Sequence, residues 1–182
     1  MPQLVFIDGA PGSGKSTLGR RVVDSRPLAL LLDVDTLRRQ LGRWRDDPGS
    51  AGLTARRIAL EMARTHLAGG HDVVIPQFVE RPGFIEEVRD VAHGTGAEFV
   101  LVALVSSPAE AASRFEQRSS SDDPNHVDAA HLQSEPGART VEDMYAGMLA
   151  MLTTFDDVRY VRSVPDDVDA TYEGLREALS HR

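Results

Sequence analysis

The sequence contains no cysteine, only one lysine and no long hydrophobic run. Without cysteine there are no disulfides, no thiolate metal ligands and no cysteine nucleophile. No apolar stretch approaches the length of a membrane span, and residues 1–8 lack the basic start and the long apolar segment of a signal peptide. We therefore expect a cytoplasmic protein with no membrane partner.

Positive charge is also in short supply. The 20 basic residues are 19 arginines and Lys15, and 28 acidic residues outnumber them, so that the formal net charge is −8. This balance disfavours a surface built for nonspecific binding to nucleic acid, although a local basic groove is compatible with it. The composition, 41% hydrophobic and 26% charged, is that of an ordinary globular protein.

Apolar runs alternate with amphipathic stretches along the chain, which is typical of βα units on a parallel sheet. A length of 182 residues fits one domain, and we expect residues 1–182 to form it. The pattern predicts an α/β fold with a five-stranded parallel sheet, helices on both faces and the first strand at its centre. Strands are predicted at 4–7, 28–32, 72–75, 99–105 and 158–161. Helices are predicted at 15–25, 36–41, 53–68, 83–93, 107–118, 140–155 and 168–179, with a loop at 43–52.

A glycine-rich segment between the first strand and the first helix carries the strongest chemical signal. It reads Gly9-x-x-x-x-Gly14-Lys15-Ser16, a complete Walker A pattern in the strand–loop–helix context that the pattern requires. The residues expected to bind ATP are Gly9, Ala10, Pro11, Gly12, Ser13, Gly14, Lys15, Ser16 and Thr17. The only lysine would bridge the β- and γ-phosphates, and the Ser16 hydroxyl would be the protein ligand of Mg²⁺. The segment therefore predicts a P-loop NTPase fold with ATP and Mg²⁺ as cofactors.

Two aspartates follow the second predicted strand, where ligands of open α/β sheets gather. Asp35 would take the proton of an acceptor hydroxyl, and Arg38 would hold an anionic part of the acceptor. Asp35 also suits the N-cap of the next helix, and from spacing alone capping and catalysis are evenly balanced. Asp33 either ends the strand or assists the acceptor and Mg²⁺.

Several pieces of the chain together resemble a family of small P-loop kinases. They are Gly9–Thr17, Asp35-x-x-Arg38, Arg114-Phe-Glu-Gln-Arg118 and Tyr145. The family includes the phage-type polynucleotide kinase domain, gluconate kinase and chloramphenicol phosphotransferase, within the AAA-type and zeta-toxin-like group. The resemblance implies that Asp35 is the general base and Arg38 the acceptor contact. It also implies that Arg114 and Arg118 are catalytic residues of a mobile lid at about 114–139.

The sequence departs from this family at the end of the third strand. Polynucleotide kinases have an aspartate there, whereas this chain reads Val74-Ile-Pro-Gln77-Phe78. Gln77 cannot supply negative charge, so we expect it to give the acceptor a neutral hydrogen bond, with a solvent-facing loop glutamine as the equal alternative. The departure weakens the case for a nucleic-acid substrate more than the case for a kinase.

Two other features carry weaker interpretations. Trp44 either lines the acceptor pocket or packs into the core. His126 and His131, five residues apart in a polar segment with no third ligand, are interpreted as ordinary loop residues rather than a metal site.

Three functions are compatible with these features. The first is an ATP-dependent phosphotransferase acting on a hydroxyl of a small molecule such as a sugar, nucleoside or antibiotic. The second is a 5′-hydroxyl polynucleotide kinase, which the Asp35–Arg38 motif favours and the net charge disfavours. The third is a nucleotide-dependent switch or binding protein without an acceptor pocket. A monomer and a homodimer are both compatible with the sequence.

Overall fold

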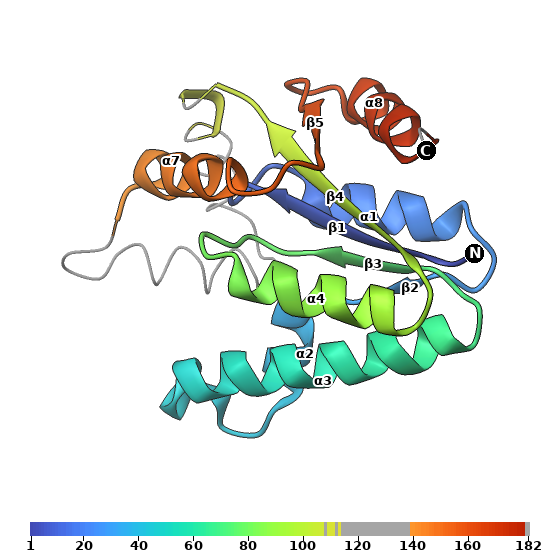
Figure 1. The fold of residues 1–182 in the computed structure, drawn as a ribbon. Coiled ribbons are helices and arrows are strands. Elements are labelled where there is room, and N and C mark those ends of the chain that lie inside the picture. Colours follow the sequence, from blue (N-terminus) through green and yellow to red (C-terminus); the bar gives the residue numbers. More distant parts are fainter. Residues whose placement is uncertain (108, 112, 114–138, 181–182) are drawn as a thin grey trace.

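The computed structural model describes residues 1–107, 109–111, 113 and 139–180 (Figure 1). The strands of the sheet are β1 Gln3–Gly9, β2 Leu30–Leu31, β3 Val73–Pro76, β4 Glu98–Val105 and β5 Val158–Arg162. The helices are α1 Lys15–Asp24, α2 Val34–Gln40, α3 Pro48–Ala68, α4 Gly83–Gly94, α7 Val141–Leu152 and α8 Val168–Ser180, and a 3₁₀ turn, η1, spans Trp44–Asp46.

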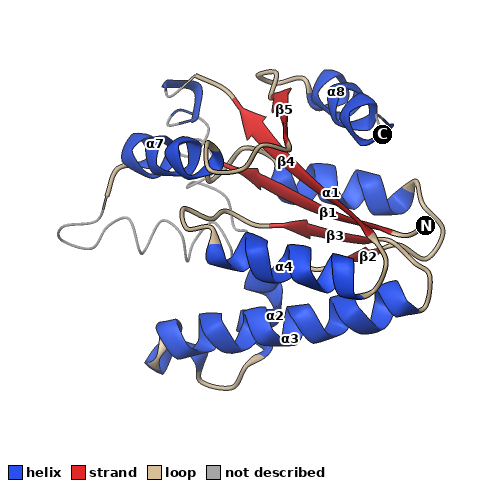
Figure 2. Ribbon diagram, in the orientation of Figure 1, coloured by secondary structure: helices blue, strands red, loops and turns tan. Residues whose placement is uncertain are grey.

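The five strands form one parallel sheet in the order β2-β3-β1-β4-β5, as predicted, with β1 in the centre (Figure 2). Alternate side chains of β1 enter two separate cores. Leu4 and Phe6 pack with α3, α4 and α7, whereas Val5 and Ile7 pack with α1 and α8. All four side chains are fully buried, which explains why residues 4–7 are all apolar.

The second strand is shorter than predicted. Only Leu30 and Leu31 pair with β3, and Leu28 lies outside the sheet with a φ of 55° and 72% of its surface exposed. β2 is an edge strand, so a single neighbour holds it. An apolar run alone does not reveal this, because it looks the same in an edge strand and a central one.

The predicted loop at 43–52 is wrong over most of its length. Residues 44–46 form η1, and α3 begins at Pro48, five residues before the predicted start. The Asp47 carboxylate accepts a hydrogen bond from the Ser50 amide at 3.0 Å, and proline follows it at the first helical position. Asp-Pro is here a helix start rather than a turn signal.

A second helix start was predicted correctly. The Ser107 amide donates to Glu110 Oε2 at 2.7 Å, and the Glu110 amide donates to Ser107 Oγ at 3.2 Å. This reciprocal pair is the expected capping box, and residues 109–111 and 113 are helical.

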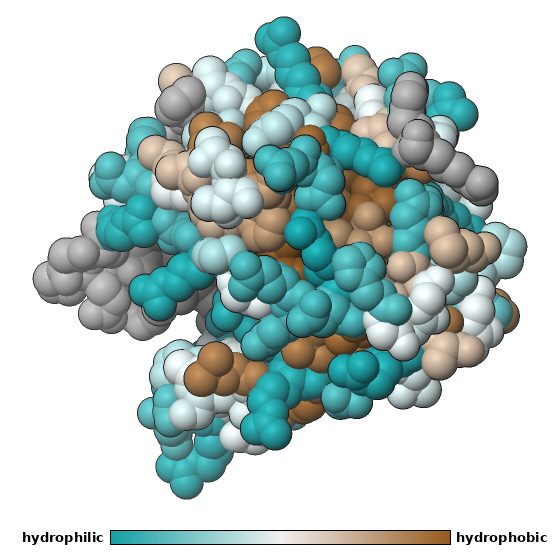
Figure 3. Space-filling view, viewed as in Figure 1, coloured by the Kyte–Doolittle hydropathy of each residue, from teal (hydrophilic) through white to brown (hydrophobic). Residues whose placement is uncertain are grey.

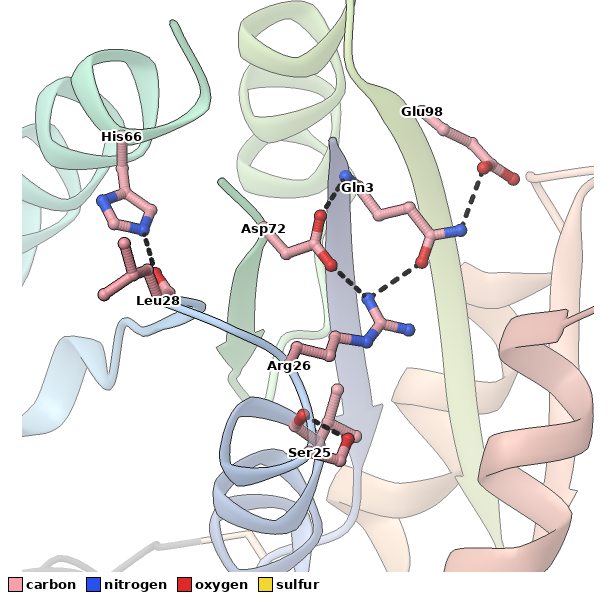
Figure 4. A network of polar contacts seen from close by, with 8 residues as sticks. Gln3, Ser25, Arg26, Leu28, His66, Asp72 and Glu98 are labelled. Carbon is pink, nitrogen blue, oxygen red and sulfur yellow. Dashed lines mark hydrogen bonds and ion pairs between the residues drawn. The ribbon is translucent and has the colours of Figure 1, made fainter. Parts of the chain in front are cut away.

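A polar network ties together the amino ends of the strands, at the edge of the sheet opposite the phosphate loop (Figure 4). Arg26, after α1, contacts Asp72 in an ion pair of 2.9 Å, and Asp72 accepts the backbone amide of Gln3 at 2.8 Å. The Gln3 side chain donates to Glu98 at 2.9 Å. These contacts join α1 to β1, β3 and β4, so the network fixes the scaffold while the opposite edge holds the candidate site.

Seen from the side of α3 and α4, the surface is mainly hydrophilic, with hydrophobic patches between the polar side chains (Figure 3). None of the helices that the structure describes is long and apolar enough to cross a membrane.

Candidate active site

The phosphate loop lies between the central strand and α1, as the sequence predicts. Gly12 and Gly14 have φ values of 83° and 90°, a backbone region that residues with a side chain rarely adopt. The Ser13 amide donates to the Ala10 carbonyl at 3.0 Å and closes the turn. Gly14 is the N-cap of α1 and provides no side-chain cap for its first amides. The helix therefore begins directly after the phosphate loop, and the positive end of its dipole lies at the loop.

Gly9 is required by close packing rather than by its backbone angles. A Cβ atom at this position would lie 2.6 Å from Ser13 Oγ and 3.0 Å from Leu104 Cβ, both shorter than normal contacts. The first glycine of the motif therefore lets the loop fold back against β4.

Lys15 places its ammonium group within the loop. Its Nζ donates to the carbonyls of Gly9 at 2.8 Å and Ala10 at 2.9 Å. An ammonium group held in the phosphate loop at the start of a helix is suited to an anionic phosphate.

Asp35 does not cap α2, so one of the two roles predicted for it is wrong. The N-cap of α2 is Asp33, whose Oδ1 accepts from the Thr36 amide at 3.0 Å. Asp35 lies in the first turn of the helix, and its carboxylate is 3.3 Å from the Arg38 guanidinium. Its side chain is 41% exposed, so the carboxylate is accessible and has no capping role.

The different roles of Asp33 and Asp35 at the start of α2 lead to a stability prediction. Replacing Asp33 by alanine should destabilise the protein by about 1 kcal/mol, because the cap is lost, whereas asparagine should cap as well as aspartate. Replacing Asp35 by alanine should cost less than the loss of Asp33. Urea unfolding of the three variants measures this difference, and a larger loss at Asp35 would contradict the cap assignment.

Trp44 is only half-buried and belongs to neither core cluster, so the core interpretation of this residue is wrong. The guanidinium groups of Arg38 and Arg45 lie 4.9 and 4.4 Å from the centre of its ring. The indole and the Asp35 carboxylate thus hold Arg38 between them.

Gln77 follows β3 beside the strand that leads into the phosphate loop. Its backbone amide donates to the Ile7 carbonyl at 3.0 Å. Its Oε1 is buried and has no hydrogen-bond partner within the described part of the chain, and its Nε2 is 3.5 Å from the Phe78 carbonyl. The side chain is not a solvent-facing loop glutamine, and it retains an unused hydrogen-bond acceptor.

One carboxylate of the site was not predicted from the sequence. Asp8 immediately precedes Gly9 and is fully buried at the end of β1. Burial raises the pKa of its carboxyl to about 7, while the charge of Lys15 and the amides of Gly9 and Val79 act to lower it. The available signal was a single acidic residue at the end of an otherwise apolar strand.

The residues present fit Mg²⁺ only in combination with a nucleotide. No group of three or more His, Asp or Glu residues that could hold a metal occurs among the residues described by the structure. The Ser16 hydroxyl is exposed at the start of α1. A single hydroxyl together with phosphate oxygens and water is a usual environment for this ion, so Ser16 fits its predicted role.

A cavity of about 150 Å³ adjoins the other side of the phosphate loop. Its walls are Gly12–Gly14 and the start of α1 on one side, and the segment from Ser163 to Thr171 on the other. The Thr171 hydroxyl accepts the Val164 amide at 2.9 Å and shapes that segment. No motif in the sequence points to these residues, because their only common property is their position in the fold.

Four predicted residues lie outside the described part of the chain: Arg114, Arg118, His126 and His131, together with most of the predicted lid. Arg139 is described, and it forms an ion pair of 2.6 Å with Glu80, in the loop after β3. Tyr145, on α7, is buried and its hydroxyl donates to the Ser106 carbonyl at 2.8 Å, so it fixes the chain after β4.

Comparison with known proteins agrees with this geometry. A family model described as an AAA domain matches residues 4–139. A gluconokinase from Sinorhizobium meliloti 1021 has a similar structure, with a TM-score of 0.59 and 19% identity over 98% of this chain and 90% of that one. The Mycobacterium tuberculosis APS kinase CysC, solved with AMPPNP and APS, has a TM-score of 0.64 and 19% identity over 99% and 98% of the two chains.

No curated protein matches the sequence significantly. At 19% identity the two solved structures establish the fold, which is that of the small P-loop kinases, and the predicted fold class and family resemblance are confirmed.

Proposed function

The chain belongs to the AAA domain family, and from that premise we propose that it transfers the γ-phosphate of ATP to a hydroxyl group of a small molecule. The observation that supports this most directly is the position of Lys15, whose ammonium group is held inside a complete phosphate loop at the carboxyl edge of the sheet. The kinases of similar fold support the reaction class.

The nucleotide side of the site is formed by the phosphate loop and its surroundings. The loop amides and the α1 dipole hold the phosphates, and Lys15 stabilises the charge on the transferred group. Ser16 would hold Mg²⁺, which would supply neutralisation of the phosphate charge. The cavity between the loop and the Ser163–Thr171 segment accommodates the part of the nucleotide that extends away from the phosphates.

The acceptor side is formed by residues that follow β2 and β3. Asp35 is the exposed carboxylate that accepts the proton of the attacking hydroxyl, and Gln77 supplies a neutral hydrogen bond to the acceptor. Arg38 contacts an anionic or strongly polar group of the acceptor, and its guanidinium is held in place by Asp35 and Trp44. Asp33 positions these groups by capping α2.

A 5′-hydroxyl nucleic-acid kinase is the second candidate, and the surroundings of Trp44 favour it. An indole ring in contact with Arg38 and Arg45 combines a stacking surface with positive charge, as in proteins that bind single strands. The net charge of −8 and the absence of an acidic residue at Gln77 favour a small acceptor instead.

An acceptor screen separates the candidates. Sugars and sugar acids, nucleosides, hydroxylated antibiotics, APS and 5′-hydroxyl oligonucleotides are each incubated with γ-labelled ATP and Mg²⁺ at low and moderate salt. We expect a labelled small molecule whose phosphorylation depends only modestly on salt, because few phosphate contacts release few counterions.

Two other outcomes would replace the proposal. Efficient labelling of the oligonucleotide that falls steeply with added salt would establish the nucleic-acid kinase. Slow hydrolysis of ATP with no labelled acceptor, together with a protein that binds in a nucleotide-dependent manner, would establish a switch.

A further inference from the structure

We propose that Asp8 is a positioning residue that joins the phosphate loop to the acceptor-side loop and takes up a proton when a nucleotide binds. The inference rests on the proposed function only in requiring that the phosphate loop binds nucleotide. It concerns a buried carboxylate to which neither the sequence motif nor the proposed reaction assigns a role.

The carboxylate of Asp8 bridges two loops with one of its oxygens. Oδ1 accepts from the Gly9 amide at 2.7 Å and from the Val79 amide at 3.3 Å. Gly9 opens the phosphate loop, whereas Val79 lies between β3 and α4, two residues after Gln77. A single side chain therefore sets the spacing between the backbone that binds phosphate and the backbone that faces the acceptor.

The second oxygen of Asp8 is in an unusual state for a carboxylate. Oδ2 is buried and has no hydrogen-bond partner in the described ranges of the chain. An ionised carboxylate normally uses both oxygens, and leaving one buried without a partner disfavours the charged form. The geometry of this oxygen thus favours the neutral form of Asp8 more than that of an exposed aspartate.

Charged groups on neighbouring elements set that balance. Lys15, at the start of α1, favours the ionised form, and Glu80, after β3, disfavours it. Glu80 is itself paired with Arg139, just before α7. With burial as the largest cause, the pKa of Asp8 is raised to about 7, so that the group titrates near neutral pH in the free protein.

Nucleotide binding changes the electrostatic balance in one direction. The phosphates carry more negative charge than the accompanying Mg²⁺ offsets, so they bring net negative charge into the loop next to Asp8. They should also draw the Lys15 ammonium away from the Gly9 and Ala10 carbonyls that it contacts in this structure. Both changes weaken the interaction that favours the Asp8 anion, so the pKa rises further in the complex. Above pH 7 the free protein is mainly deprotonated at Asp8 and the complex is protonated, and a proton is taken from solvent on binding.

The sign of the pH dependence follows from this difference. Because the complex holds more protons than the free protein, nucleotide affinity falls as pH rises above about 7, by up to about tenfold per pH unit. Below that pH, Asp8 is already neutral before binding and contributes no dependence. The neutral acid keeps its Oδ1 contacts, so the two loops stay in register while the charge is removed.

Calorimetric titration with Mg²⁺–ADP tests the proposal directly. Titrations between about pH 7.5 and 8.5 in two buffers of different ionisation heat give the number of protons taken up per nucleotide. We expect more than about half a proton for the unmodified protein. The terminal phosphate of the nucleotide is then largely deprotonated and contributes little.

Two substitutions test whether Asp8 is the group that takes up the proton. Asp8→Asn mimics the neutral acid and should abolish the uptake and flatten the dependence of affinity on pH. Asp47→Asn is the matched control, since Asp47 also accepts a backbone amide, from Ser50, but is exposed and has a lowered pKa. This control should retain the full proton uptake.

The outcomes distinguish this inference from the proposed function. Tight nucleotide binding without proton uptake, or with uptake that persists in Asp8→Asn, would overturn the role of Asp8 and leave the kinase intact. Absence of nucleotide binding in the unmodified protein would overturn both. If Asp8→Asn does not fold, difference infrared spectra of the unmodified protein decide: a protonated-carboxyl band must appear on addition of Mg²⁺–ADP, and its absence would refute the proposal.

Discussion

Replacement of Lys15 by alanine is expected to reduce phosphoryl transfer by on the order of 10³-fold while leaving the melting temperature nearly unchanged. The ammonium group contacts carbonyls of the phosphate loop rather than the hydrophobic core, and its main role is to stabilise charge on the transferred phosphoryl group. Transfer of labelled phosphate to the acceptor identified by the screen, and intrinsic ATP hydrolysis, measure the effect.

The chain offers sharp controls for this variant. Arg20→Ala removes a basic side chain from the same helix, where Arg20 is exposed and paired only loosely, at 3.9 Å, with Asp24, so activity should be retained. Lys15 is the only lysine, and an amine-reactive ATP analogue should therefore label it alone among the side chains. Labelling confined to the amino terminus, or full activity in Lys15→Ala, would remove Lys15 from the mechanism.

The phosphate loop could be predicted from the sequence because its requirements are local. Two glycines at positive φ, a lysine and a hydroxyl are needed within eight residues, and the flanking strand and helix follow the same short segment. That β1 is covered on both faces could also be predicted, since residues 4–7 are all apolar and all fully buried.

Features that depend on neighbours in space could not be predicted in this way. Asp33 and Asp35 are two residues apart and both suit an N-cap, and only the backbone of the chain entering α2 decides between them. The walls of the cavity beside the phosphate loop come from residues 12–18 and 163–171, which no local pattern connects. Asp8 stands beside the motif, but its bridging contact to Val79 spans 71 residues.

Replacement of Asp35 by asparagine is expected to lower transfer by about 10²–10⁴-fold, the usual effect of losing a general base, with Mg²⁺–ATP affinity changed by only a few-fold. The structure makes this substitution more informative than the sequence alone did. Because Asp33 provides the cap, asparagine at position 35 leaves the start of α2 intact. The asparagine amide oxygen can still accept a hydrogen bond from the half-buried Arg38 guanidinium, so the protein should remain folded at the assay temperature.

A matched control lies one turn beyond α2. Asp46 pairs with an arginine three residues away, Arg43, at 2.5 Å, and this pair is more exposed than that of Asp35 and Arg38, so Asp46→Asn removes the same charge outside α2. If Asp35 is the base, only Asp35→Asn loses the chemical step, and single-turnover transfer slows while nucleotide binding persists. Equal activities of the two variants would show that Asp35 merely orients Arg38, because a neutral amide at 35 can still hold the guanidinium against Trp44. In that case another group must take the proton of the acceptor hydroxyl, and the Asp35 carboxylate would have no part in the proton transfer.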